Sequence, residues 1–198
     1  MGGIFCLEGL WDEDLEEKCS VYPILKMVEM NGKNPFLHHR VATSGDMDYY
    51  LSRWKKSCRK SYPILYFAFH GESGMLLIGE QRYTLGQLSE KLENSCREAF
   101  IFFASCKTVN IPDETIKRFL QTTKVKGILG YRNTVVWIIS AAFEILLLSE
   151  IVAIDLTPNG LSRLKRRADV ISNNFKKIDL LFATEKRIHR WEKNSSRP

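Results

Sequence analysis

Residues Ile64–Gly71 read ILYFAFHG, and six apolar side chains in succession precede the final His-Gly pair. A strand formed by such a run is buried on both faces, which is typical of the centre of a parallel sheet. Residues Ala99–Cys106 read AFIFFASC and repeat the pattern. The first run ends at His70 and the second at Cys106, so a reactive side chain follows each of these strands.

Shorter apolar runs alternate with helical patterns along the rest of the chain, which indicates a parallel sheet covered by helices. We expect strands over residues 4–7, 37–42, 64–69, 99–104 and 125–129, and a small hairpin over 75–84. We expect helices over 20–30, 44–60, 85–92, 112–120 and 134–153, with Ser20 and Thr84 as caps, and a basic helical region after Pro158. The predicted fold class is α/β, a three-layer α/β/α sandwich with a mainly parallel sheet.

The chain shows no internal repeat, low-complexity tract or linker, and its 198 residues suit a single domain. Its five cysteines are an odd number without a CxxC pair, so we expect reduced thiols. His38 and His39 are adjacent on an expected strand and point to opposite faces, so they cannot bind a metal together. No Gly-rich nucleotide fingerprint occurs. We therefore predict neither a metal nor a cofactor.

The spacing of His70 and Cys106 predicts a catalytic pair. Ligands of parallel sheets bind beyond the carboxyl ends of the strands, and neighbouring strands lie about 5 Å apart there. Covalent cysteine catalysis needs a thiol that attacks a carbonyl and an imidazole that moves protons. A lone Cys or His is more often structural, but finding both at the ends of the two most apolar strands favours catalysis. Gly71 lacks a Cβ atom, which lets backbone N–H groups approach a substrate oxygen.

The blocks Tyr66–Gly71 and Phe102–Cys106 resemble the His-Gly and Ala/Ser-Cys motifs of the caspase-like clan of cysteine peptidases. That clan includes caspases, metacaspases, separase, gingipains and CHAT peptidases. The resemblance covers about residues 4–155, and Val125–Tyr131 with the apolar helix after it is similar to a CHAT segment. The caspase pentapeptide around the cysteine is absent. The resemblance implies a caspase-like fold with a central strand order 2-1-3-4 and adjacent His and Cys strands.

The resemblance also implies a mechanism. Cys106 would attack the scissile carbonyl, and His70 would protonate the leaving amine and then activate water. The backbone N–H groups of Gly71 and Cys106 would form the oxyanion hole. No third catalytic residue can be named from the sequence. Arg132, in the loop after the fifth strand, is predicted to contact the substrate, with a loop-capping or solvated position as the alternative.

The positive charge is concentrated at the end of the chain. Residues 159–198 hold 11 Lys and Arg against 4 Asp and Glu, whereas residues 1–158 carry a net charge of −1. A basic segment of this kind can bind nucleic acid, but a solvated helix face is the commoner interpretation. Two further hypotheses therefore stand beside the peptidase: a catalytically silent caspase-like regulatory or binding module, and nucleic-acid binding through residues 159–198.

The sequence and the resemblance also give expectations about the location and the regulation of the protein. The start of the chain lacks a secretory pattern, and the longest apolar run, 135–153, contains Glu144 and Glu150. We therefore expect a cytoplasmic protein without a membrane anchor. The resemblance implies a protein substrate, control by an activating partner or a small-molecule signal, and, by analogy with bacterial relatives, an effector role in antiviral defence or cell death.

Overall fold

A computed structural model describes residues 2–12, 19–175 and 177–191 as a mixed α/β structure. The strands of this described part are β1 (Ile4–Glu8), β2 (Phe36–Arg40), β3 (Ile64–Glu72), β4 (Met75–Ile78), β5 (Gln81–Thr84), β6 (Phe100–Ser105), β7 (Gly127–Tyr131), β8 (Leu180–Thr184) and β9 (Arg187–Trp191). Its helices are α1 (Tyr22–Gly32), α2 (Ser44–Arg53), α3 (Leu85–Lys91), α4 (Asp113–Thr123), α5 (Trp137–Ala153) and α6 (Pro158–Ser172), with a π-helical turn, η1 (Trp54–Cys58), after α2.

The strands form one sheet in the order β2-β1-β3-β6-β7-β8-β9, and the β4–β5 hairpin is attached to β3. The first five strands of this order are parallel, whereas β8 and β9 are antiparallel. The expected central order is confirmed, because β3 and β6 are neighbours with Phe69 opposite Ser105. The strands that lead to His70 and Cys106 therefore run side by side.

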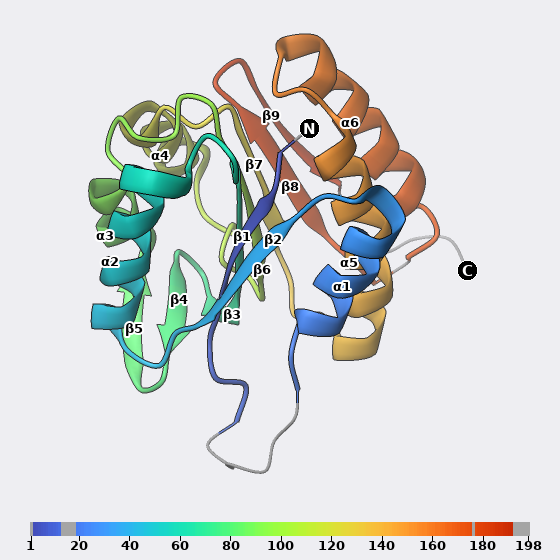
Figure 1. Cartoon of the computed structure of the whole chain (residues 1–198). Helices are drawn as coiled ribbons and strands as arrows, with labels where there is room; N and C mark the ends of the chain where they lie inside the picture. Colours follow the sequence, from blue (N-terminus) through green and yellow to red (C-terminus); the bar gives the residue numbers. More distant parts are fainter. Residues whose placement is uncertain (1, 13–18, 176, 192–198) are drawn as a thin grey trace.

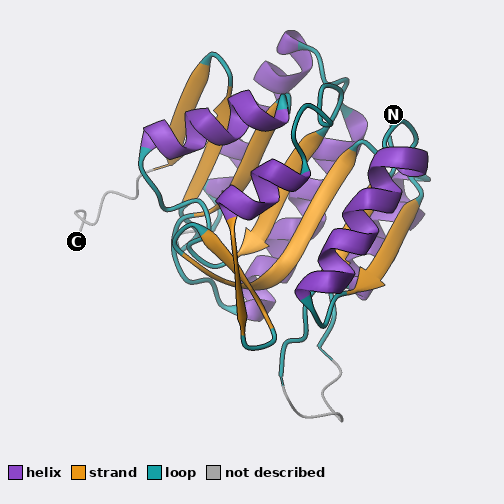
Figure 2. Ribbon diagram, turned by 90° about the vertical axis from the view of Figure 1, so that its left-hand side faces the viewer, coloured by secondary structure: helices purple, strands orange, loops and turns teal. Residues whose placement is uncertain are grey.

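Helices cover both faces of the sheet (Figure 1). One layer holds α1, α5 and α6, and the other holds α2, α3 and α4. Figure 2 shows the sheet between these layers. Side chains alternate accordingly: Phe67 stacks on Phe103 within the core on one face, and Tyr66 stacks on Phe102 within the core on the other. The predicted three-layer α/β/α sandwich with a mainly parallel sheet is confirmed.

Two of the observed differences from the predicted elements occur next to the site. Strand β3 was expected to end at Phe69, but it continues to Glu72 because its last residues pair with β4. Thr84 caps α3 through a capping box, as expected. The N-cap of α1 is Val21, one residue after the expected Ser20, but the Ser20 hydroxyl still accepts a hydrogen bond from the Tyr22 N–H at the start of the helix. The carboxylate of Glu8 accepts hydrogen bonds from both the Ser20 hydroxyl and the Val21 N–H.

The basic region is only partly the predicted helix. Helix α6 ends at Ser172, and residues 180–191 then form the β8–β9 hairpin, which extends the sheet beyond β7. Leu181, expected on a helix, lies in β8 opposite Gly130. The apolar run Leu180–Ala183 is buried on both sides, which a strand within a sheet satisfies better than one face of a helix. Arg163, Arg166 and Arg167 of α6 are exposed, as a solvated helix face requires.

Candidate active site

The structure brings His70 and Cys106 to one cavity of about 240 Å³ at the carboxyl ends of the strands. His70 lies on the extension of β3, and Cys106 lies in the turn directly after β6. His70 is exposed and Cys106 is half-buried, so both can meet a molecule from solvent. The apolar side chains that line the cavity are Trp11, Val21, Phe69, Ala104, Val135 and Trp137. The polar and reactive ones are Cys19, His70, Cys106, Tyr131, Ser140 and Glu144.

Gly71 allows β3 to lie against the turn that carries Cys106. A Cβ atom at position 71 would be 2.6 Å from the Cys106 carbonyl oxygen and 2.4 Å from Thr108 Oγ1. The same turn is joined to the hairpin, because Gly74 N–H donates to the Thr108 carbonyl and the Thr108 hydroxyl donates to the Met75 carbonyl. The absence of a side chain at Gly71 therefore keeps the segment after His70 in contact with the cysteine turn.

The imidazole of His70 has a backbone partner that the sequence did not reveal. Its Nε2 lies 2.8 Å from the carbonyl oxygen of Trp11, in the loop that follows β1. A carbonyl oxygen only accepts, so Nε2 carries the proton and Nδ1 is the basic nitrogen of the neutral ring. The Trp11 indole also packs edge-on against the ring, with centroids 5.3 Å apart. Because β1 neighbours β3, the loop after β1 was the place to look for this partner.

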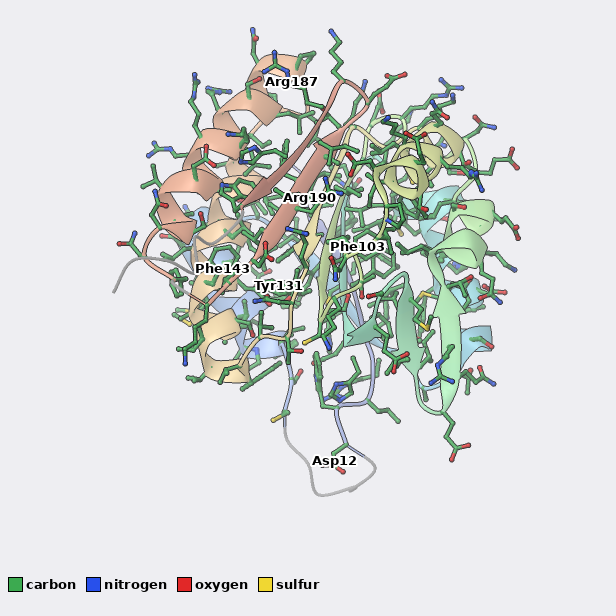
Figure 3. All side chains as sticks on the ribbon, turned by 180° about the vertical axis from the view of Figure 1, so that it is seen from behind. Asp12, Phe103, Tyr131, Phe143, Arg187 and Arg190 are labelled. Atoms are coloured by element: carbon green, nitrogen blue, oxygen red, sulfur yellow. The ribbon has the colours of Figure 1, made fainter. Side chains whose placement is uncertain are left out.

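Glu144 of α5 contributes a buried carboxylate to the cavity. Only 4% of the residue is exposed, and its carboxylate accepts hydrogen bonds from the hydroxyl groups of Tyr66 and Tyr131. Burial raises the pKa of this carboxyl group to about 7, although the two tyrosines act in the opposite direction. Figure 3 shows Tyr131 of β7 beside Phe143 of α5, the helix that carries Glu144. The ring centroids of Tyr131 and Phe143 are 6.2 Å apart. The signal in the sequence was a carboxylate, one of two, within a predominantly apolar helix.

Arg132 does not line this cavity. Its backbone N–H donates to the Asp179 carbonyl, and its guanidinium group lies 3.4 Å from the Asp179 carboxylate. Both side chains are largely buried, with 19% and 25% exposed. This ion pair ties the loop after β7 to the segment before β8. The interaction is closer to the loop-capping alternative than to a substrate contact.

His38, His39, Cys6 and Cys96 do not line the cavity and have structural environments. His38 lies 2.5 Å from the Glu8 carboxylate, whereas His39 stacks on Tyr50, so the two histidines occupy opposite faces of β2 as expected. Burial raises the pKa of the Cys6 and Cys96 thiols, that of Cys96 to about 12. Cys6, Cys58, Cys96 and Cys106 are free thiols.

Among the described residues, no group of three or more His, Cys, Asp and Glu side chains could hold a metal ion. None of the helices in the described part has the length and apolar character needed to cross a membrane.

Comparison with solved structures agrees with the architecture. A secreted C11 cysteine protease from Bacteroides thetaiotaomicron, solved with an irreversible peptide inhibitor, is similar with a TM-score of 0.60 and 10% identity over 94% of this chain and 67% of that chain. Caspase-1 from Spodoptera frugiperda is similar with a TM-score of 0.51 and 12% identity over 84% of this chain and 77% of that chain. At these identities the likeness shows a shared caspase-like fold.

Sequence comparison gave one family. A model described as "Family of unknown function (DUF6642)" matches residues 2–154, which include the candidate site. No curated protein matches the chain.

Proposed function

The chain belongs to the DUF6642 family of unknown function, and we propose that it is a cysteine peptidase acting through Cys106 and His70. The observation that carries the proposal is that both side chains line one cavity at the carboxyl edge of a caspase-like sheet. The Trp11 carbonyl adds the orienting partner that a catalytic imidazole needs. The substrate class is a protein or peptide.

The proposed reaction follows from the positions of these groups. Nδ1 of His70 takes the proton of the Cys106 thiol, and the sulfur attacks the scissile carbonyl carbon to give a tetrahedral intermediate. The backbone N–H groups of Gly71 and Cys106 are proposed to stabilise its oxyanion. The intermediate collapses as the imidazolium protonates the leaving amine, which departs and leaves a thioester. His70 then takes a proton from water, which attacks the thioester and releases the acid and the free thiol.

Several wider features belong to the same proposal and rest on the resemblance or on sequence patterns. They are a single domain over residues 1–198, a CHAT-like relationship, a cytoplasmic location, control by an activating partner or small-molecule signal, and an effector role in defence. A substrate contact by Arg132 also stays a prediction, and it would require the guanidinium group to leave Asp179.

Labelling with a thiol-directed electrophile tests the nucleophile. We expect Cys106 to react before Cys58, which is also half-buried, because Cys106 shares a cavity with the imidazole of His70 and Cys58 does not. His70→Ala should slow the labelling of Cys106 and leave that of Cys58 unchanged, as measured by peptide mass mapping over time. Cleavage of a peptide library should be lost in Cys106→Ala and His70→Ala and kept in the control Cys58→Ala.

The same experiment separates the peptidase from a catalytically silent module. Preferential labelling of Cys58 or Cys19, or equal library cleavage by wild type and Cys106→Ala, would refute the dyad. A silent module would show slow Cys106 labelling that does not depend on His70.

A further inference from the structure

Glu8 forms an unusually well-bonded buried carboxylate at the end of β1. The residue is 0% exposed. Its two oxygens accept hydrogen bonds from Trp11 Nε1 at 2.6 Å, the Ser20 hydroxyl at 2.8 Å and the Val21 N–H at 2.7 Å. His38 Nε2 lies 2.5 Å from the same group. One side chain thus joins the loop after β1, the start of α1 and strand β2.

Burial and hydrogen bonding oppose each other in the pKa of Glu8. Burial raises the pKa, but the bonds from His38, Trp11, Val21 and Ser20 outweigh it, and the net pKa lies below its ordinary value. The carboxylate is therefore ionised at neutral pH. Hydrogen bonds to an ionised acceptor are shorter and stronger than neutral ones, so the groups around Glu8 are held firmly.

Trp11 connects this carboxylate to His70. The indole N–H is bonded to Glu8, and the backbone carbonyl of the same residue faces Nε2 of His70. The Trp11 ring packs against His70 on one side and against Trp137 at 5.1 Å on another. The residue that Glu8 holds by its indole is therefore the same residue whose carbonyl oxygen orients the imidazole.

We propose that Glu8 is a positioning residue for His70: it fixes Trp11 so that the Trp11 carbonyl holds the imidazole with its proton on Nε2 and Nδ1 free to act as the base. The effect of Glu8 on peptide cleavage rests on the proposed function. The effect of Glu8 on the tautomer of His70 is independent of that function.

Two substitutions interrupt the connection at different points. Glu8→Gln keeps the shape of the side chain but removes the charged acceptor, and Trp11→Phe removes the indole N–H while keeping an aromatic ring and the carbonyl. Displacement of a catalytic group by about 1 Å can cost on the order of 100-fold in rate, so each variant should lower kcat/KM by about 10- to 100-fold. In Glu8→Gln the loss should fall on kcat more than on KM, because Glu8 does not line the cavity. Trp11 does line it, so Trp11→Phe should change KM as well.

A double variant tests whether the effect passes through Trp11. If Glu8 acts on His70 only by holding the indole, Glu8→Gln combined with Trp11→Phe should be no less active than the weaker single variant. Multiplied losses would show that Glu8 acts on activity by another route, and that result would overturn the proposal.

The ring nitrogens of His70 give a readout that does not require catalysis. Nitrogen-15 spectra of the full chain, with the His70 signals assigned from their absence in His70→Gln, should show protonated Nε2 and unprotonated Nδ1 in the wild type. In Glu8→Gln and Trp11→Phe the two tautomers should mix. An unchanged tautomer in both variants overturns the inference, whether or not the protein cleaves peptides.

Tyr83→Phe is a matched control for stability. It removes another part-buried hydrogen bond, from the Tyr83 hydroxyl to Asp48 at 2.7 Å, on the hairpin away from the cavity. It should lower the melting temperature while leaving kcat/KM and the His70 spectrum unchanged. A parallel loss of activity in Tyr83→Phe would show that Glu8 matters only for stability and would overturn the proposal. If Glu8→Gln does not fold, Trp11→Phe alone decides through the spectrum.

Discussion

Gly71 shows at the scale of a single residue how backbone packing makes the candidate site. Any side chain at position 71 meets the carbonyl oxygen of Cys106 and the hydroxyl of Thr108 at less than 3 Å. The Cys106 contact is with backbone, so relief requires movement of the whole cysteine turn away from β3. The sequence indicated that Gly71 follows His70, the predicted catalytic histidine, but only the structure shows which atoms a side chain would displace.

Gly71→Ala should therefore damage both stability and the site. We expect the free energy of unfolding to fall by about 1–3 kcal/mol, as in overpacked cores, and thiol labelling of Cys106 to change in rate. Gly86→Ala is the control, because a Cβ atom there meets its nearest neighbour at an ordinary 3.6 Å within α3 and should raise helix stability. Urea unfolding of both variants measures the contrast. Equal stability of the two variants would contradict the packing argument.

At the scale of secondary-structure elements, prediction succeeded where hydrophobic periodicity and turn chemistry agree. The runs that became β3 and β6 are apolar on both faces, and Thr84 followed by Gln87 gives the capping box of α3. The β8–β9 hairpin was missed because its apolar run is short, is flanked by basic residues and follows a true helix, α6. Its partner, β7, lies some 50 residues earlier in the chain, so no local pattern specifies the pairing.

The β8–β9 hairpin is part of the folded core and is not a peripheral extension. Leu181 is 0% exposed and packs in the cluster that contains Phe103 and Ile128, and Arg190 of β9 forms an ion pair with Asp113 of α4. Leu181→Ala should lower the free energy of unfolding by about 2–5 kcal/mol. Val170→Ala, at a position 61% exposed on α6, should change it by no more than about 0.5 kcal/mol. Similar small effects of both substitutions, measured by chemical denaturation, would mean that this region is peripheral.

At the scale of the whole molecule, the sequence predicted which strand ends meet but not what surrounds them. Topology alone brings the residues after β3 and β6 together, so His70 and Cys106 could be placed in advance. The positions of the Trp11 carbonyl and of Glu144 could not be predicted, because each enters the cavity from an element whose orientation depends on packing over the full sheet. For Arg132 the sequence identified the loop but not the ion-pair partner, because Asp179 lies 47 residues away along the chain.

Two buried carboxylates give the molecule opposing dependences of stability on pH. The pKa of Glu8 is lowered on folding, so its contribution is present above its ordinary value of 4.5 and is lost as the pH falls below it. The pKa of Glu144 is raised to about 7, so its contribution is complete below 4.5 and is lost as the pH rises through 7. His38, Arg40 and Cys6 surround Glu8, while Tyr66, Tyr131 and Cys6 surround Glu144.

The free energy of unfolding should therefore be greatest near pH 5 and decline toward pH 8. The part of this decline due to Glu144 is about 2–3 kcal/mol, since it reflects a carboxyl group that must ionise while buried. Glu144→Gln removes the titrating group and keeps an acceptor oxygen for one tyrosine hydroxyl, so its stability should depend less on pH and should gain on the wild type as the pH rises. Urea unfolding of both proteins at pH 5, 6.5 and 8 measures the difference between them, in which the contributions of groups common to both proteins cancel. If the two proteins keep a constant difference across this range, Glu144 is already ionised at pH 5 and its burial does not raise its pKa.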